Sequence, residues 1–180
     1  MKFSNSGEMA SVAAGDDMLL RPNQEFYIPE FAEHLSCVPQ VIVKINRLGK
    51  CISPKFASRY FEEMAAGIVF HADSLEEKLA MEGLPQTQAY TFEGAGAMSG
   101  LQAFEPGSSM TFYRNGERIF SQKITDLPFR PSDCVSYASQ YHLMKIGDLV
   151  FCGNNARFPI KQGDLLEMEL GETKLECRIM

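Results

Sequence analysis

Histidines are the natural acid–base candidates of this chain. There are three, His34, His71 and His142, and none has a histidine or cysteine partner at the spacing of a metal site. His71 follows an apolar run and precedes Asp73 by two residues, so this His-x-Asp pair is the best isolated candidate for proton transfer. The alternative for His71 is a polar histidine at the end of a strand. His142 lies on a predicted helix face, where packing or surface exposure accounts for a histidine without a chemical role.

Other reactive side chains offer little chemistry on their spacing alone. The chain has five cysteines, Cys37, Cys51, Cys134, Cys152 and Cys177, and no two of them form a CxxC pair, so a zinc site is not expected. Most lie scattered among apolar residues, which is typical of free thiols in a reducing, cytoplasmic protein. No serine lies in a nucleophile elbow. Gly94-Ala95-Gly96 is too short to cradle a phosphate. The acidic run 73–77 is explained by helix capping.

Composition and charge exclude several classes of partner. The 180 residues predict one domain at 17–180, preceded by an irregular arm at 1–16. The net charge is −6 and no basic run exists, so neither nucleic acid nor an anionic membrane has electrostatic support. The longest apolar runs fall far short of the roughly 20 residues that span a membrane.

A doubled turn sequence stands out near the C-terminus. Lys145-Ile146-Gly147-Asp148-Leu149 and Lys161-Gln162-Gly163-Asp164-Leu165 each predict a turn that feeds a strand. Glycine adopts the positive φ of such a turn, and the aspartate is expected to hydrogen-bond the backbone just beyond it. The polar loop 153–159 lies between the two turns, at the end of an apolar strand. Such loops on rigid strands are common places for binding sites.

The remaining pattern predicts a mainly β chain with short helices, an α+β domain. Alternation predicts a half-buried strand at 41–48, and Asn115-Gly116 predicts a hairpin at 110–121 with a type I′ turn. We predict three helices. The first begins at Ser53-Pro54 and ends before Gly67, the second covers 75–81 and is capped by Asp73 or Ser74, and the third covers 132–144. We also expect a short apolar strand at 67–70, a long loop at 86–109 and a closing hairpin at 165–179.

From about Asp17 onward the chain resembles the fumarylacetoacetate hydrolase family. It is most similar to small single-domain members that act on acylpyruvates, oxaloacetate or hydroxy-heptadienedioate substrates. The resemblance implies a twisted β-sandwich roll, usually a homodimer. The matching pieces occur in the family's order: 22–31, 45–50, 56–60, Gly67-Ile68, Gly83-Leu84-Pro85, Phe92-Glu93-Gly94, Asn115-Gly116, Gln122, Thr125-Asp126-Leu127 and Ile146-Gly147-Asp148-Leu149.

The resemblance also implies where a metal would bind. In the family a Glu-x-Glu pair and one Asp hold Mg²⁺ or Mn²⁺, which polarises a 2-oxo-acid. Here those positions are occupied by Val38, Gln40 and Val69. We therefore expect no metal cofactor unless Mg²⁺ or Mn²⁺ uses an altered form of the site. Tyr90 stands at the position of the active-site lysine.

Other positions of the resemblance suggest where a substrate would bind. The substrate loop reads Gly153-Asn154-Asn155, and Gln122 is a further substrate-binding candidate.

Two functions follow from this resemblance. In the first, the fold has kept a binding or regulatory role for an unknown ligand, such as a small 2-oxo-acid or carboxylate, and has lost metal-dependent catalysis. In the second, the chain is an active hydrolase, decarboxylase or isomerase on a small 2-oxo-acid. It would then work without the usual metal, through His71 with Asp73 or Tyr90 with Asn154.

Overall fold

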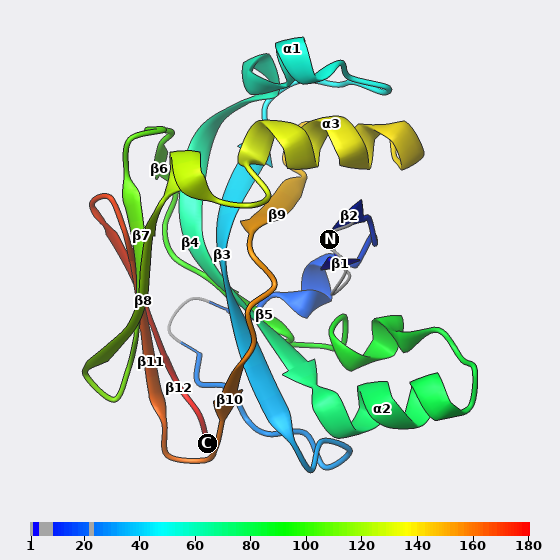
Figure 1. Ribbon diagram of the computed structural model, residues 1–180, viewed down its shortest axis with the longest axis vertical. Helices are drawn as coiled ribbons and strands as arrows, with labels where there is room; N and C mark the ends of the chain where they lie inside the picture. The colour runs from blue at the N-terminus through cyan, green and yellow to red at the C-terminus, as the bar shows by residue number, and fades with distance from the viewer. Residues whose placement is uncertain (1, 4–8, 22–23) are drawn as a thin grey trace.

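Two antiparallel sheets pack face to face in the computed structural model, which describes residues 2–3, 9–21 and 24–180 (Figure 1). The helices cover the outer face of the larger sheet. Its strands are β3 (Leu35–Ile45), β4 (Phe61–Ala72), β5 (Gly96–Met98), β6 (Gln102–Ala103), β9 (Leu149–Gly153) and β10 (Phe158–Ile160). The smaller sheet contains β7 (Ser109–Arg114), β8 (Glu117–Lys123), β11 (Leu165–Leu170) and β12 (Thr173–Arg178). The predicted mainly β sandwich with short helices is confirmed.

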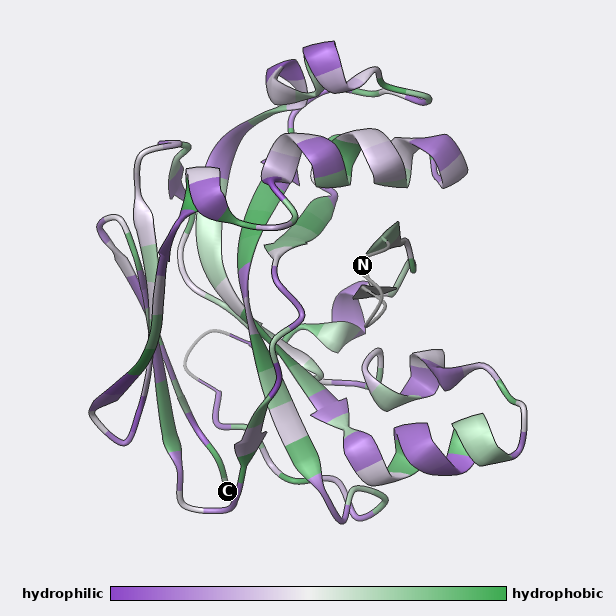
Figure 2. Ribbon diagram, viewed as in Figure 1, coloured by the Kyte–Doolittle hydropathy of each residue, from purple (hydrophilic) through white to green (hydrophobic). Residues whose placement is uncertain are grey.

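The larger sheet is built around β3 and β4, which pair antiparallel along nearly their whole lengths. β4 also pairs with β5 and β6, and β3 with β9 and β10. The smaller sheet has the order β12-β11-β7-β8. Figure 2 shows hydrophobic residues concentrated along β3, β4 and β9, as expected for strands at the centre of the molecule.

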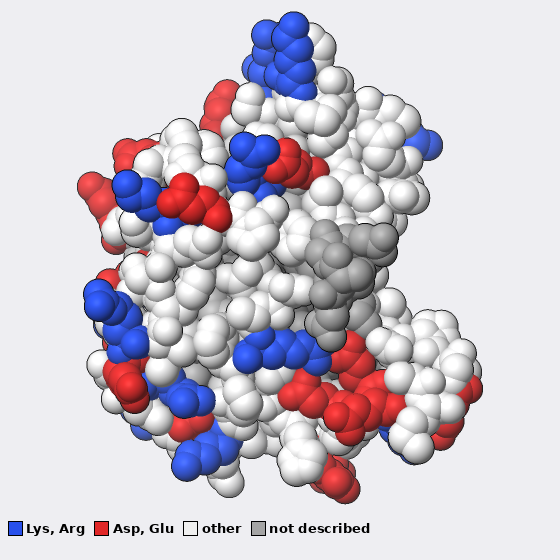
Figure 3. Space-filling view, viewed as in Figure 1, with Lys and Arg blue, Asp and Glu red and all other residues white. Residues whose placement is uncertain are grey.

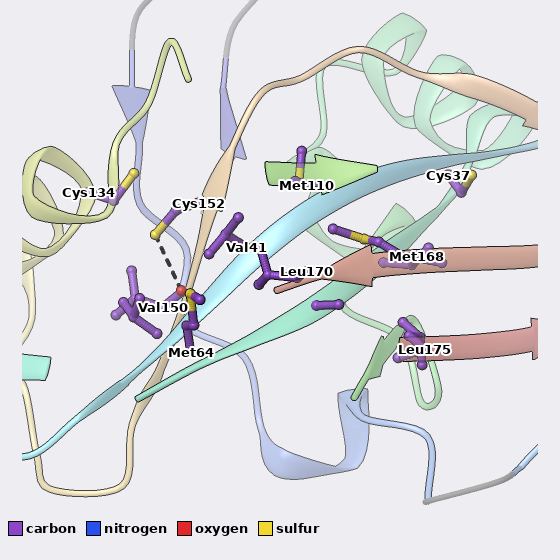
Figure 4. Packing of buried hydrophobic residues seen from close by; sticks show 14 of the residues in the cluster. Cys37, Val41, Met64, Met110, Cys134, Val150, Cys152, Met168, Leu170 and Leu175 are labelled. Atoms are coloured by element: carbon purple, nitrogen blue, oxygen red, sulfur yellow. Dashed lines mark hydrogen bonds between the residues drawn. The ribbon is translucent and has the colours of Figure 1, made fainter. Parts of the chain in front are cut away.

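Both faces of β3 are buried, whereas the sequence predicted a half-buried strand. On the inner face, Cys37 and Val41 pack with Met168 and Leu170 of the smaller sheet (Figure 4). The opposite face carries Val38, Gln40 and Ile42, which are also buried. Alternation alone cannot reveal this, because the second face is covered by segments distant in sequence.

Pro39 lies in the middle of β3, a place where proline is rare because it has no N–H for the ladder. The pairing pattern explains its presence. β10 pairs with residues 35–37 of β3, and β9 pairs with residues 40–44. Pro39 therefore faces the gap between β9 and β10 on that side. In this gap the chain leaves the sheet as the loop 154–157.

The predicted helix at Ser53-Pro54 is correct only at its start. Helix α1 covers Pro54–Ala57 and a 3₁₀ turn, η2, covers Ser58–Tyr60, after which β4 begins at Phe61. Phe61 and Met64, assigned to the helix by their spacing, therefore lie in a strand. Pairing of β4 with β3 outweighs the local helix preference of the Glu-Glu-Met-Ala-Ala segment.

The turns agree well with the sequence. Asn115 and Gly116 both have positive φ, 54° and 80°, as a type I′ hairpin requires. Gly147 and Gly163 have φ of 95° and 91° in the doubled turn. One detail was wrong: Asp148 accepts a hydrogen bond from the N–H of Lys145, three residues earlier, rather than from the backbone beyond it.

The longer helices lie where the sequence placed them. Helix α2 covers Asp73–Met81 and α3 covers Pro131–Tyr141. Their N-caps are Ala72 and Arg130, one residue or more before those predicted. No helix in the described ranges is long and apolar enough to cross a membrane.

The arm and the long loop contain more regular structure than the sequence suggested. Strands β1 (Lys2–Phe3) and β2 (Met9–Ala10) pair within the arm expected at 1–16, of which residues 1 and 4–8 lie outside the described part. Residues 22–23 of the segment 22–31 also lie outside it. Further 3₁₀ turns are η1 (Asp16–Met18), η3 (Gln86–Ala89) and η4 (Ile124–Asp126). The loop 86–109 contains η3, β5 and β6.

Candidate functional site

A cavity of about 670 Å³ opens on the helix-covered face of the larger sheet. Its walls come from the segment 11–16, the end of α3 with the turn after it, and the loop that follows β9. Seven of the positions singled out from the sequence line it: Val38, Gln40, Val69, His71, Tyr90, Asn154 and Asn155. Four segments distant in sequence, namely β3, β4, the end of η3 and the loop after β9, therefore bring most of the candidate residues together.

The register of β3 and β4 explains why four of these residues meet. Val38 is paired directly with Val69, and Ser36 with His71. Residues opposite each other in an antiparallel pair share a face, and so do residues two apart on one strand. Gln40 therefore lies on the same face as Val38, and this face forms the floor of the cavity.

Three predicted site residues do not line this cavity. Gln122 lies on β8 of the smaller sheet, where its Nε2 donates to the carbonyl oxygen of Asp126 at 2.6 Å. Asp73 lines a separate surface cavity. Gly153 ends β9 with φ of 135°, and its N–H and carbonyl are both bonded to Phe129. Its contribution is the chain direction that sends Asn154 toward the cavity.

His71 is buried, with 8% of its surface exposed. Its ring lies 5.2 Å from the Tyr90 ring, centroid to centroid, and its Nδ1 lies 3.8 Å from Glu76 Oε2. Burial lowers the pKa of His71 below 6.5, against the opposing effect of Glu76, so the imidazole is neutral near pH 7. Burial also raises the pKa of Tyr90 to about 12, so its hydroxyl stays protonated.

The partner of His71 differs from the one suggested by the His-x-Asp spacing. Asp73 Oδ1 accepts hydrogen bonds from Ser36 Oγ and from Arg157 Nη1, each at 2.8 Å. The carboxylate placed beside His71 Nδ1 is that of Glu76, one turn further along α2. The helix turns Asp73 toward the surface and brings Glu76 to the histidine.

Arg157 is a site residue that sequence reasoning missed. Its Nη1 lies 2.6 Å from Glu76 Oε2 and 2.8 Å from Asp73 Oδ1, and the residue lines both cavities. Figure 3 shows acidic side chains gathered beside a basic one near α2, and no broad basic patch on this face. The polar loop 153–159 was a signal for this region. The ion pairs of Arg157 with Asp73 and Glu76 join residues some eighty positions apart, and no local sequence pattern predicts them.

Two buried amides occupy the floor and the loop edge of the cavity. Gln40 Nε2 donates to the backbone carbonyl of Asn154 at 2.6 Å, and Asn154 Oδ1 accepts from the N–H of Ala156 at 2.8 Å. These bonds fix the orientation of both amides. Within the described residues, Gln40 Oε1 and Asn154 Nδ2 are left buried without a hydrogen-bond partner.

The donor set at the implied metal position does not fit Mg²⁺ or Mn²⁺. These ions are held by oxygen ligands, usually with at least one carboxylate. Val38 and Val69 offer no donor atom, and Gln40 offers one neutral oxygen. Across the described ranges, no group of three or more His, Cys, Asp or Glu side chains is arranged to hold a metal ion.

Comparison with known proteins decides the family. A family model described as fumarylacetoacetate (FAA) hydrolase C-terminal matches residues 9–180. The chain belongs to this family. No curated protein sequence matches it.

Solved structures of the family share the fold at low sequence identity. A fumarylpyruvate hydrolase from Pseudomonas aeruginosa, in complex with Mn²⁺ and pyruvate, has a TM-score of 0.84 and 18% identity over 93% of this chain and 76% of that chain. A 2-hydroxyhepta-2,4-diene-1,7-dioate isomerase from Mycobacterium marinum has a TM-score of 0.81 and 17% identity over 93% and 67%. At such identities the likeness establishes the fold, and function has to be argued from the site.

Proposed function

We propose that this family member has lost metal-dependent catalysis and binds a small molecule in the cavity without a metal, in a binding or regulatory role. The observation that carries the proposal is the identity of the three residues at the metal position. Val38, Gln40 and Val69 lie on one face of β3 and β4 and are all buried. The cavity and its polar loop are present, and none of the three residues at the implied metal position is charged.

The energetic reason is the cost of removing a dication from water. Binding a divalent ion replaces its hydration shell with protein ligands, and anionic ligands supply most of the compensation. An ion held against two valines and one amide would lack that compensation, which costs many kcal/mol. The carboxylates of α2, Asp73 and Glu76, do not remedy this, because both are paired with Arg157.

Isothermal titration calorimetry tests the loss of the metal site. EDTA-treated protein is titrated with MgCl₂ and with MnCl₂ near pH 7. We expect no stoichiometric heat at either metal. A one-to-one site with micromolar affinity would rule the proposal out.

One observation favours a second candidate, an acid–base reaction on a small 2-oxo-acid. His71 is neutral and buried at the cavity beside Tyr90, which suits a general base. In this scheme His71, with Glu76 beside it, takes a proton from the substrate, and Tyr90 or Asn154 donates to the carbonyl oxygen. Asp73 supports the arrangement only indirectly, through Arg157.

Turnover in the presence of EDTA separates the two functions. Oxaloacetate and an acylpyruvate are the substrates, and His71→Ala is compared with His34→Ala, which alters an exposed histidine. Activity that survives EDTA and is lost only in His71→Ala supports the second candidate. Our first proposal expects no turnover above the rate without protein.

Two further features belong to the same proposal. We propose a homodimer, supported by the exposed apolar side chains Leu48, Leu143 and Ile146 next to the Gly49–Met144 backbone bridge. We also propose a reducing, cytoplasmic setting, supported by five free cysteines, four of which are buried.

A further inference from the structure

The unpaired atoms of Gln40 and Asn154 define a chemical pattern at the cavity. Gln40 Oε1 is an acceptor without a donor, and Asn154 Nδ2 is a donor without an acceptor, among the described residues. Only 3% of Gln40 and 6% of Asn154 is exposed. A buried polar group without a partner is uncommon in folded proteins and suggests that a ligand or an ordered water completes it.

The two groups belong to one unit of structure. Gln40 on β3 is paired with Gly153, the residue before Asn154, and the Gln40 side chain bonds the Asn154 backbone. The acceptor is thus held on β3 and the donor on the loop that directly follows its neighbour β9, and both residues line the cavity. Their other amide atoms are already bonded, which fixes which atom of each is left over.

We infer that the ligand carries a neutral amide, such as a carboxamide, lactam or cyclic imide, whose N–H bonds Gln40 Oε1 and whose carbonyl bonds Asn154 Nδ2. The inference rests on the proposed metal-independent binding function. An amide places one donor next to one acceptor, which is the complement of this pair. Both atoms are buried, so the two side chains would have to turn for the ligand to reach them.

A carboxylate ligand fits this part of the cavity less well. Both of its oxygens are acceptors, so one of them would face Gln40 Oε1 without a proton between them. Two cationic residues line the cavity, Lys145 and Arg157, and Arg157 is already bonded to Glu76 and Asp73. The side chains around the amide pair, Val38 and Val69, offer no charge to compensate the loss of hydration of an anion.

Three fragments of equal size test the inference: benzamide, benzoate and acetophenone. Each is titrated into EDTA-treated, ¹⁵N-labelled protein, and binding is followed on the side-chain N–H signals of Gln40 and Asn154. We expect benzamide to bind, with a dissociation constant that is at least roughly tenfold lower than those of benzoate and acetophenone. Its titration shifts the Asn154 signals most strongly.

Asn154→Asp provides the matched variant. Aspartate keeps the oxygen that accepts from the Ala156 N–H, so the loop is retained, but it replaces the donor with an acceptor. We expect the preference for benzamide to disappear. Gln140→Glu is the control, since it adds the same charge at an exposed position of α3 that does not line the cavity, and we expect it to leave the preference unchanged.

The failures of the two proposals are distinguishable. Benzoate or acetophenone binding in the cavity as tightly as benzamide overturns the amide inference and leaves metal-independent binding intact. An unchanged preference in Asn154→Asp overturns it as well. If none of the three fragments nor pyruvate binds the cavity, both the inference and the proposed function are contradicted.

Discussion

His71 links the chemistry of the site to the stability of the fold. Its imidazole is buried against Tyr90, and burial lowers its pKa from the ordinary value of 6.5. The unfolded chain therefore binds a proton at a higher pH than the folded chain does. The contribution of His71 to the free energy of unfolding is therefore largest above pH 6.5. It is lost as the pH falls from 6.5 toward the pKa of His71 in the folded state.

The free energy of unfolding should consequently fall on acidification in a way that depends on His71. We expect a slope from this group of up to about 1.4 kcal/mol per pH unit below pH 6.5. Urea unfolding at pH 7.5, 6.5 and 5.5 measures it, with His71→Gln compared to His34→Gln. His71→Gln should flatten the dependence. Equal slopes in the two variants would show that His71 is not buried in its neutral form.

At the residue scale, the sequence predicted most of the positions that line the cavity but not how the side chains pair. Val38, Gln40 and Val69 were placed by resemblance, and the register of two strands brings them together. The pairing of Asp73 with Arg157, and of Glu76 with His71, depends on where α2 docks. That docking is a tertiary contact with no local signature in the sequence.

The face shared by β3 and β4 determines whether a metal can bind. Val38 and Val69 are directly opposed, and Gln40 is two residues along the same face. Carboxylates at these three positions would converge on one point. Without a metal they would repel one another in a buried setting, and a dication would relieve that repulsion.

Restoring the carboxylates should therefore create a metal-dependent fold. We expect the variant Val38→Glu/Gln40→Glu/Val69→Asp to lose about 3–5 kcal/mol of stability in EDTA. Mn²⁺ at a hundred times its dissociation constant should return about 2.7 kcal/mol. Thermal unfolding with EDTA and with MnCl₂ measures both, and the parent chain is the control. A parent chain stabilised as strongly as the variant would contradict this account.

At the element scale, turns were predictable and strand boundaries were not. The Asn115-Gly116 hairpin and the Gly147 and Gly163 turns follow from φ preferences, which are local. Phe61 and Met64 were assigned to a helix because their spacing and their Glu-Ala neighbours favour one. Both residues lie in β4 because β3 pairs with β4 along nearly its whole length. Such pairing is determined by the complete fold and not by the local sequence.

At the scale of the whole molecule, the exposed apolar residues point to association. Leu48, Leu143 and Ile146 are 64%, 47% and 71% exposed and lie around the bridge between Gly49 and Met144. Apolar side chains gathered on one part of a surface are typical of interfaces between proteins. A homodimer would cover these side chains. Because the turn after α3 also lines the cavity, the dimer contact would narrow the cavity mouth.

Sedimentation equilibrium tests the homodimer. We expect the parent chain to sediment at twice the 20.1 kDa monomer mass. Leu48→Asp/Ile146→Asp should weaken association at least roughly tenfold, because charges would be buried at the contact. Met81→Asp, at a distant exposed position on α2, is the control. A parent chain that sediments as a single 20.1 kDa species would refute the homodimer.

We propose that the cavity takes its ligand without a metal. The most direct measurement is an anomalous difference map from crystals grown in MnCl₂, recorded at the manganese edge. We expect no anomalous peak within bonding distance of Gln40 Oε1, between Val38 and Val69. A well-defined peak at that point would contradict the proposal and would return the protein to the metal-dependent enzymes of its family.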